Sequence, residues 1–135
     1  MSSVLSPITV VSTDRAPAAG GHYSQAVKHG GLIYVSGQLP VQLGAAHNTE
    51  AAFEDQARLA LANLLAVLDA AGSTPRHLLK VTVYLVGIEN WPRFNAVYAE
   101  ILGDIKPARS IVPVPALHYG YLVEIDAVAA QGSDV

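Results

Sequence analysis

One amphipathic stretch constrains this sequence more than any other: residues 49–72, TEAAFEDQARLALANLLAVLDAAG. Its apolar side chains recur at the 3.6-residue spacing of an α-helix and form one stripe, made of Phe53, Ala57, Leu61, Leu64 and Leu68. Asn48 or Thr49 can cap the start of this helix, and Gly72 can end it. A helix with one apolar stripe needs a second layer of structure to cover that stripe.

The segments around this helix predict a sheet as that second layer. We expect a first strand over residues 5–12 and then a hairpin, in which a short strand, a turn at Gly30–Gly31 and a strand over 32–36 follow one another. Three further strands are expected over 79–87, 108–114 and 121–130. The first strand contains Pro7, which is tolerated in an edge strand.

Residues 90–103 predict a second helix, with Asn90 as its cap, Pro92 in its first turn and Gly103 as its end. Its expected apolar side consists of Trp91, Phe94, Val97, Tyr98 and Ile101. The order is three strands, helix, strand, helix and two strands. Two helices on one face of a mixed sheet give a two-layer α+β fold, which we expect as one domain over residues 1–135.

The composition limits what such a chain can do. The chain has no cysteine, which excludes disulfides, a thiol nucleophile and thiolate metal sites. Hydrophobic residues make up 51% and charged residues 14%, which indicates an apolar surface and therefore oligomerisation. The net charge of -3, without a cluster of Lys or Arg, argues against a nucleic-acid partner. No signal-peptide pattern and no run of ~20 apolar residues is present, so we expect a soluble, cytoplasmic protein without a membrane partner.

Two charged residues, Arg109 and Glu124, lie in segments otherwise suited to burial. Alternate residues of a strand share a face. Glu124 therefore shares a face with Leu122, Asp126 and Val128, whereas Val123, Ile125 and Ala127 form the face suited to the helices. In the preceding strand, Arg109 shares a face with Ile111 and Pro113. If the two strands lie near each other, Arg109 and Glu124 can line one pocket.

Two interpretations of this pair remain open from the residues alone. The Arg109 guanidinium can bind a substrate carboxylate through two parallel hydrogen bonds, while Glu124 orients or deprotonates a water molecule. Alternatively, Arg109 forms a structural ion pair with Glu124 or Asp126 at a subunit interface.

The other candidate residues carry weaker patterns. The five histidines, at positions 22, 29, 47, 77 and 118, have no metal-binding spacing, and with no cysteine they do not predict a zinc site. The loops GGHYS and SGQLP match no phosphate-binding motif, and Ser36 is not in a G-x-S-x-G elbow. Tyr23 can face a cleft or simply pack, and Asn95 can simply hydrogen-bond a turn.

Four segments together resemble the RidA family, also called YjgF/YER057c/UK114: GGHYSQAVKHGGLIYVSGQLP, FNAVYAE, PARSIVPV and LVEIDAVAA. They stand in the family's order and spacing, and the resemblance covers residues 16–130. It implies a chorismate-mutase-like fold and a homotrimer with a central barrel and three clefts between subunits. The implied activity, a form of metabolite damage control, is hydrolysis of enamines and imines, such as 2-aminoacrylate and 2-iminobutyrate, to 2-keto acids and ammonia, without metal or cofactor.

The resemblance also implies roles for individual residues. Arg109 is similar to the arginine that holds the substrate carboxylate, and Glu124 to the glutamate that holds the attacking water. The matching substrate-binding positions are Tyr23, Ser36, Gly37, Asn95 and Ile111.

This sequence departs from the family pattern at three places. His22 stands where proline is usual, Ile111 stands where cysteine is common, and LHYGYL replaces the usual turn before the last strand, which could bring His118 or Tyr119 to the cleft mouth. The competing functions are a non-catalytic trimer that binds a small carboxylate and regulates a metabolic partner, and a stress-related holdase.

Overall fold

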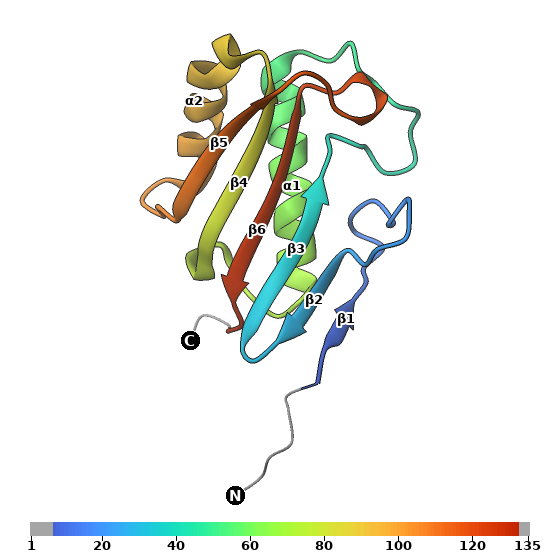
Figure 1. Cartoon of the computed structure of the whole chain (residues 1–135), viewed down its shortest axis with the longest axis vertical. Coiled ribbons are helices and arrows are strands. Elements are labelled where there is room, and N and C mark those ends of the chain that lie inside the picture. Colours follow the sequence, from blue (N-terminus) through green and yellow to red (C-terminus); the bar gives the residue numbers. More distant parts are fainter. Residues whose placement is uncertain (1–6, 133–135) are drawn as a thin grey trace, which may run out of the picture.

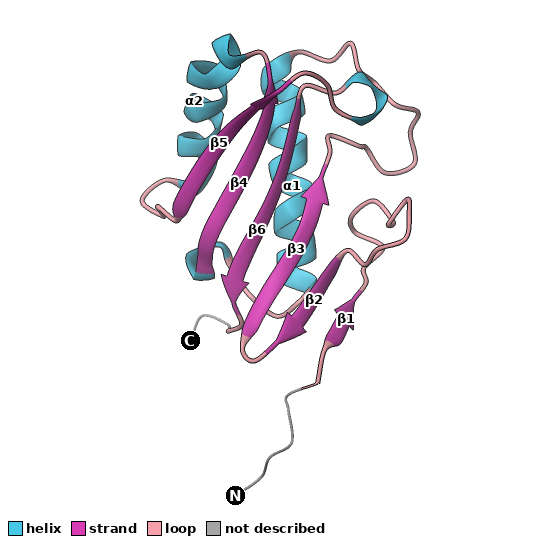
Figure 2. Cartoon of the chain, viewed as in Figure 1, coloured by secondary structure: helices cyan, strands magenta, loops and turns pink. Residues whose placement is uncertain are grey.

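The computed structural model describes residues 7–132, which form a six-stranded sheet with two helices on one face (Figures 1 and 2). In chain order the elements are β1 (Thr9–Val11), β2 (Ala26–His29), β3 (Leu32–Gln38), α1 (Phe53–Ala70), β4 (Leu78–Val86), α2 (Trp91–Leu102), β5 (Ala108–Val114) and β6 (Val123–Ala130). This order confirms the predicted α+β arrangement. The first strand is shorter than predicted, and positions 5 and 6 of that prediction lie outside the described residues.

The strand order across the sheet is β1-β2-β3-β6-β4-β5. All neighbouring strands are antiparallel except β4 and β5, which are parallel and are connected through α2, so the sheet is mixed as predicted. One consequence matters for the site: β4 lies between β5 and β6, the strands that carry Arg109 and Glu124. Figure 1 shows both helices behind the sheet.

The core lies between the helices and this covered face of the sheet. All five residues of the predicted α1 stripe are buried, and α1 packs against β3, β6 and α2. The sheet contributes the predicted face of β6 and the matching face of β4, that is Val123, Ile125, Ala127, Val81, Val83 and Leu85. Burial of each valine, leucine, isoleucine or phenylalanine side chain in this contact contributes about 1.5–3 kcal/mol, so the contact between α1 and the sheet stabilises the fold.

The start of α1 differs from the prediction. The helix begins at Phe53, and neither Asn48 nor Thr49 caps it. The buried amide of Gln56 explains the difference: it donates to the carbonyls of Thr49 and Ala51 and accepts from the backbone N–H of Leu122. These bonds hold the preceding segment in a turn that docks on the entrance to β6.

The predicted helix ends are correct. Gly72 adopts φ +87° two residues after the end of α1, and Gly103 adopts φ +60° directly after α2. Both values fall in the left-handed region that favours glycine. Asn90 occupies the cap position of α2, but its side-chain amide donates to the Val86 carbonyl and does not cap the helix.

The buried side of α2 consists of Phe94, Val97, Tyr98 and Leu102. Phe94, Val97 and Tyr98 belong to the core, as predicted. The prediction was wrong for Trp91 and Ile101, which keep 39% and 37% of their surface exposed. Leu102, next to Ile101 at the end of the helix, is buried in its place.

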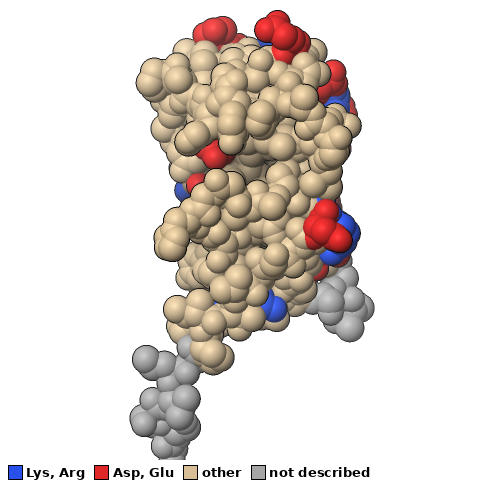
Figure 3. Space-filling model, turned by 90° about the vertical axis from the view of Figure 1, so that its right-hand side faces the viewer, with Lys and Arg blue, Asp and Glu red and all other residues tan. Residues whose placement is uncertain are grey.

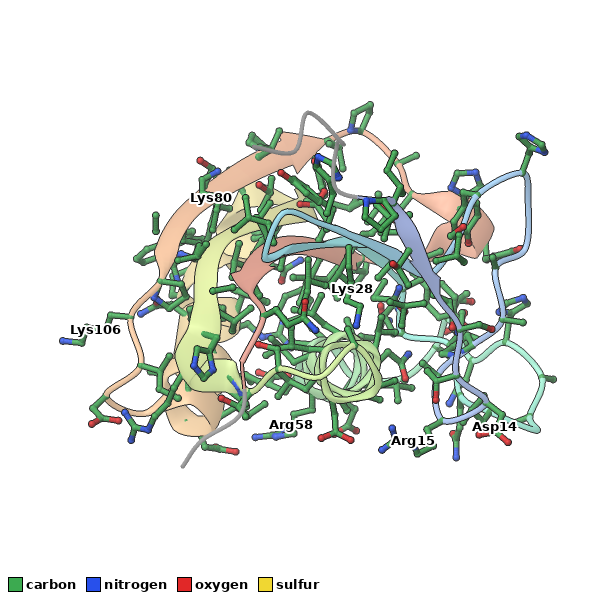
Figure 4. The ribbon with its side chains drawn as sticks, turned by 90° about the horizontal axis from the view of Figure 1, so that it is seen from below. Asp14, Arg15, Lys28, Arg58, Lys80 and Lys106 are labelled. Atoms are coloured by element: carbon green, nitrogen blue, oxygen red, sulfur yellow. The ribbon has the colours of Figure 1, made fainter. Side chains whose placement is uncertain are left out.

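The two faces of the sheet differ in their charged side chains. Lys28 lies on the helix side, where its ammonium donates to the Ala71 carbonyl at the negative end of the α1 dipole (Figure 4). Lys80 lies on the opposite side, which no helix of the described chain covers (Figure 4). This uncovered face also carries Tyr34 and Val112, which are 43% and 37% exposed. None of the described helices is long and apolar enough to cross a membrane.

Candidate functional site

The predicted site residues fall into two groups on opposite faces of the sheet. Arg109 pairs in register with Val81, whose side chain is fully buried under the helices. Glu124 pairs with Tyr84, which alternates with Val83 and therefore points to the uncovered face. Since residues paired in register share a face, Arg109 and Glu124 cannot meet within one chain. The condition for a shared pocket, that the two strands lie near each other with these side chains on one face, is therefore not met within one chain.

The first group, the arginine half-site, consists of Arg109, Asn95, Tyr98 and Ile111. The Arg109 guanidinium donates from Nη1 to Oδ1 of Asn95 at 3.0 Å. Its Cζ lies 4.9 Å from the centre of the Tyr98 ring, within the range of a cation–π contact. Asn95 and Tyr98 are three residues apart on α2 and therefore on one side of that helix. Ile111 lies two residues beyond Arg109 on the same face and packs against the core.

Tyr98 was expected only as a core residue, and its contact with Arg109 was not predicted. The side chain is 7% exposed, and its hydroxyl is buried without a hydrogen-bond partner among the described residues. Burial raises the pKa of this phenol, so it stays neutral. The ring therefore supports the guanidinium through its face, and the other donors of Arg109 make no hydrogen bond within the described chain.

The second group, the glutamate half-site, lies in a pocket of about 480 Å³. Three loops, 12–25, 39–52 and 115–122, gather around it near one end of the sheet (Figure 1). Among the lining residues are four of the predicted site positions, Tyr23, Ser36, Gly37 and Glu124. His118 and Tyr119 also line the pocket, as expected from the unusual turn, whereas His22 does not.

Gly37 and Glu124 fit closely together. A Cβ atom on Gly37 would lie 2.6 Å from Oε2 and 3.0 Å from Cδ of Glu124. The register of β3 against β6 shifts between Val35 and Gln38, which places Ser36 and Gly37 at an irregularity of the strand. Ser36 is fixed there by its hydroxyl, which donates to the Ser24 carbonyl at 2.6 Å. The missing side chain of Gly37 therefore leaves the space that the carboxylate occupies.

The Glu124 carboxylate is the one available for chemistry. Burial raises its pKa, the nearby His118 opposes this shift, and Asp126 adds to it. The carboxylate has no hydrogen-bond partner among the described residues. Asp126, in contrast, accepts a hydrogen bond from the Tyr84 hydroxyl at 3.0 Å. An unengaged, half-buried carboxylate can bind and deprotonate water.

The pocket wall also contains His47, which the sequence marked only as one of five histidines without metal-binding spacing. His47 comes from the loop between β3 and α1, where no periodicity or motif marks it. Its ring stacks on Tyr119, and its Nδ1 lies 2.9 Å from the Tyr121 hydroxyl. Tyr23 folds back on its own loop, where its hydroxyl accepts from the Gly20 N–H.

The two half-sites offer different chemical groups. The arginine half-site offers an oriented cation with free donors, which suits a carboxylate ligand. The glutamate half-site offers a half-buried carboxylate on the wall of a pocket that is open to solvent. Within residues 7–132 no group of three or more His, Asp or Glu side chains lies close enough to hold a metal ion.

Comparison with known proteins places the chain among described relatives. The family model for Endoribonuclease L-PSP matches residues 13–131. A rat protein named 2-iminobutanoate/2-iminopropanoate deaminase is 39% identical over 132 residues, covering 98% of this chain and 95% of its own length. Protein mmf1, mitochondrial, of Schizosaccharomyces pombe is 40% identical over 117 residues, 84% of this chain and 71% of that protein. The crystal structure of E. coli TdcF with bound serine matches with a TM-score of 0.84 and 35% identity, covering 92% of this chain and 99% of that one.

Proposed function

The chain belongs to the Endoribonuclease L-PSP family, which includes the RidA proteins, and on that premise we propose that it hydrolyses 2-imino acids to 2-keto acids and ammonia. The relative named as an imine deaminase supports this reaction. The observation that carries the proposal is the pair of half-sites: a carboxylate-binding Arg109 and an unengaged Glu124, each incomplete alone. The serine named with TdcF is also a small molecule with a carboxylate.

The proposal requires a neighbouring copy of the chain. Arg109 and Glu124 lie on opposite faces of one sheet, so a complete site needs Arg109 from one copy and Glu124 from the next. A ring of three copies supplies three such sites, and the uncovered faces of the sheets would line its central barrel. The exposed Tyr34 and Val112 on that face and the low charge content support an assembly of this kind. Light scattering tests it, and a stable monomer at micromolar concentration would overturn the composite site.

In the proposed reaction Arg109 binds the substrate carboxylate and fixes the position of the imine carbon. Glu124 of the adjacent copy accepts a proton from water as the water oxygen bonds to that carbon. The imine nitrogen takes up that proton, which gives the carbinolamine. Transfer of the remaining hydroxyl proton to the nitrogen then breaks the carbon–nitrogen bond and leaves a keto group and ammonia. One imino acid and one water thus give one keto acid and one ammonia. The imine is electrophilic by itself, so positioning and acid–base catalysis suffice.

The decisive experiment generates imines in situ with an amino-acid oxidase and follows their loss with and without the protein. We expect faster loss of the imine and faster release of ammonia. Arg109→Lys and Glu124→Gln should both remove most of the acceleration. Activity that survives in both variants would overturn the proposed roles of these residues.

Two other outcomes concern function without imine turnover. A carboxylate-binding regulator would bind 2-keto acids in an Arg109-dependent manner without releasing ammonia. A holdase would suppress client aggregation without needing Arg109. Either result, in place of turnover, would replace the deaminase proposal.

RNA cleavage is the further alternative, because the family model carries an endoribonuclease name. The charge distribution disfavours RNA as substrate, since the net charge is -3 and phosphate binding relies on Lys and Arg. Few Lys and Arg side chains appear on the side of the molecule shown in Figure 3. RNA should therefore stay intact in the presence of protein that hydrolyses imines.

A cytoplasmic location is part of the proposal. The name of the Schizosaccharomyces pombe relative makes mitochondria the competing location for this chain. Cell fractionation with an antibody against the full chain decides between the two.

A further inference from the structure

Three rings form a fixed cluster at the pocket, which we name the ring cluster: His47, Tyr119 and Tyr121. The His47 and Tyr119 rings stack with centres 3.9 Å apart and planes at 21°. Tyr121 meets both rings edge-on, at 5.6 Å from His47 and 6.2 Å from Tyr119. Tyr121 is 1% exposed, and its hydroxyl lies 2.9 Å from Nδ1 of His47, so the base of the cluster is anchored in the protein.

The backbone holds Tyr119 in an unusual conformation. Among the described residues, Tyr119 is the only non-glycine residue with positive φ, at +65°. Residues other than glycine, asparagine and aspartate adopt this region rarely, and a bulky residue there requires support from its surroundings. The Tyr119 side chain is 60% exposed, so burial in the core does not offset the cost of this backbone conformation. The conformation instead places the ring on the wall of the pocket.

The ring cluster and Glu124 share one pocket. Tyr119, His47 and Glu124 all line it, and the neighbouring His118 is close enough to Glu124 to affect the pKa of that carboxylate. A substrate with a methyl or ethyl side chain would leave most of this pocket unfilled, since its volume is about 480 Å³. Leu39 and Val41 add apolar surface to the pocket, and its lining contains no Lys or Arg that would bind an acidic side chain.

We propose that the ring cluster is a subsite for an aromatic substrate side chain, so that the preferred substrates are 2-imino acids derived from aromatic amino acids. This inference rests on the proposed function and specifies its substrate class. A planar side chain can stack on the exposed surface of Tyr119, which His47 supports from its stacked position. The rigid ring needs little further ordering when substrate binds, which favours affinity.

The test compares two imines, one generated from phenylalanine and one from alanine, and reports the ratio of their kcat/KM values. Tyr119→Gly is the main variant, because glycine adopts φ +65° without strain and removes only the ring. We expect this ratio to fall at least fivefold in Tyr119→Gly and to be preserved in Tyr119→Phe. Leu43→Ala is the matched control, because Leu43 is 49% exposed on the same loop as His47 but does not line the pocket. The ratio of kcat/KM values in Leu43→Ala should equal that of the wild type.

The outcomes separate the two levels of the proposal. If the wild type accelerates loss of the alanine imine but Tyr119→Gly leaves the ratio unchanged, the subsite is wrong and the deaminase proposal stands. If the wild type accelerates the loss of neither imine, both the subsite proposal and the deaminase proposal are wrong. If Tyr119→Gly dissociates the oligomer in light scattering, the ring belongs to the contact between copies, which overturns the subsite. Calorimetric titration of phenylpyruvate and pyruvate provides a second readout, in which only phenylpyruvate should bind more weakly to Tyr119→Gly.

Discussion

Replacing Gly37 by alanine tests whether the position of the Glu124 carboxylate controls turnover. The added Cβ would lie 2.6 Å from Oε2, 3.0 Å from Cδ and 3.3 Å from Cγ of Glu124. Ordinary contacts begin near 3.4 Å, so the carboxylate oxygen must retreat by about 0.8 Å. Gly37 does not have the positive φ that would strain an alanine, so the backbone tolerates the change. The substitution therefore displaces the base while leaving the fold in place.

The expected cost follows from that displacement. A misplacement of about 1 Å at a reacting group can lower the rate ~10²-fold, so we expect kcat for imine hydrolysis to fall by about 30- to 100-fold. The melting temperature should change little. Gly20→Ala is the matched control, since Gly20 lines the same pocket but a Cβ there meets nothing within 4 Å.

A double-mutant cycle makes this test specific. In a Glu124→Gln background the base is already absent, so Gly37→Ala should cost far less than it does in the wild type. Equal losses in both backgrounds would mean that Gly37 acts on something other than Glu124. A Gly37→Ala protein with wild-type kcat would refute the idea that this carboxylate must sit against position 37.

Three further predictions follow from the two half-sites. Arg109→Lys should melt near the wild-type temperature but bind 2-keto acids about 30-fold or more weakly in calorimetry, because lysine cannot form two parallel bonds to a carboxylate. Tyr98→Leu should weaken the same binding by about 2- to 30-fold, because a cation–π contact contributes ~0.5–2 kcal/mol. Tyr98→Phe keeps the ring and should bind 2-keto acids as the wild type does. It should also melt at the same or a higher temperature, because it removes a buried hydroxyl that has no partner among the described residues. Glu124→Gln should lower kcat by ~10²–10⁴-fold. Glu124 must be ionised to act as base and burial raises its pKa above the ordinary 4.5, so kcat/KM of the wild type should rise with pH through a value above 4.5, and this limb should vanish in Glu124→Gln.

Local patterns in the sequence were sufficient for most of the fold. The stripe of α1 and the alternation in β6 depend on residues close in sequence, and both apolar sets are buried where predicted. The early start predicted for α1 failed because Gln56, through bonds to Leu122 and the preceding loop, decides where the helix begins. That contact spans 66 residues, so no local rule could supply it.

The same distinction explains the outcome for the site. Alternation placed Arg109 with Ile111 and Glu124 with Asp126 correctly within each strand. It could not say that β4 separates the two strands, nor which face of β5 turns to the helices, because pairing in a sheet is a long-range property. Tyr98 and His47 were missed as site residues for a related reason: their importance lies in what they contact, Arg109 and Tyr119, and neither contact leaves a motif.

The placement of Arg109 and Glu124 on opposite faces of one sheet has a genetic consequence in the proposed trimer. A chain with Arg109→Lys still carries an intact Glu124, and a chain with Glu124→Gln still carries an intact Arg109. If the two defective chains are co-expressed and assemble at random, about a quarter of the sites should join an intact arginine to an intact glutamate. Two alleles that are each inactive should then complement each other, to roughly a quarter of the wild-type rate. Two mutations confined to one half-site, such as Arg109→Lys and Asn95→Ala, should never do so.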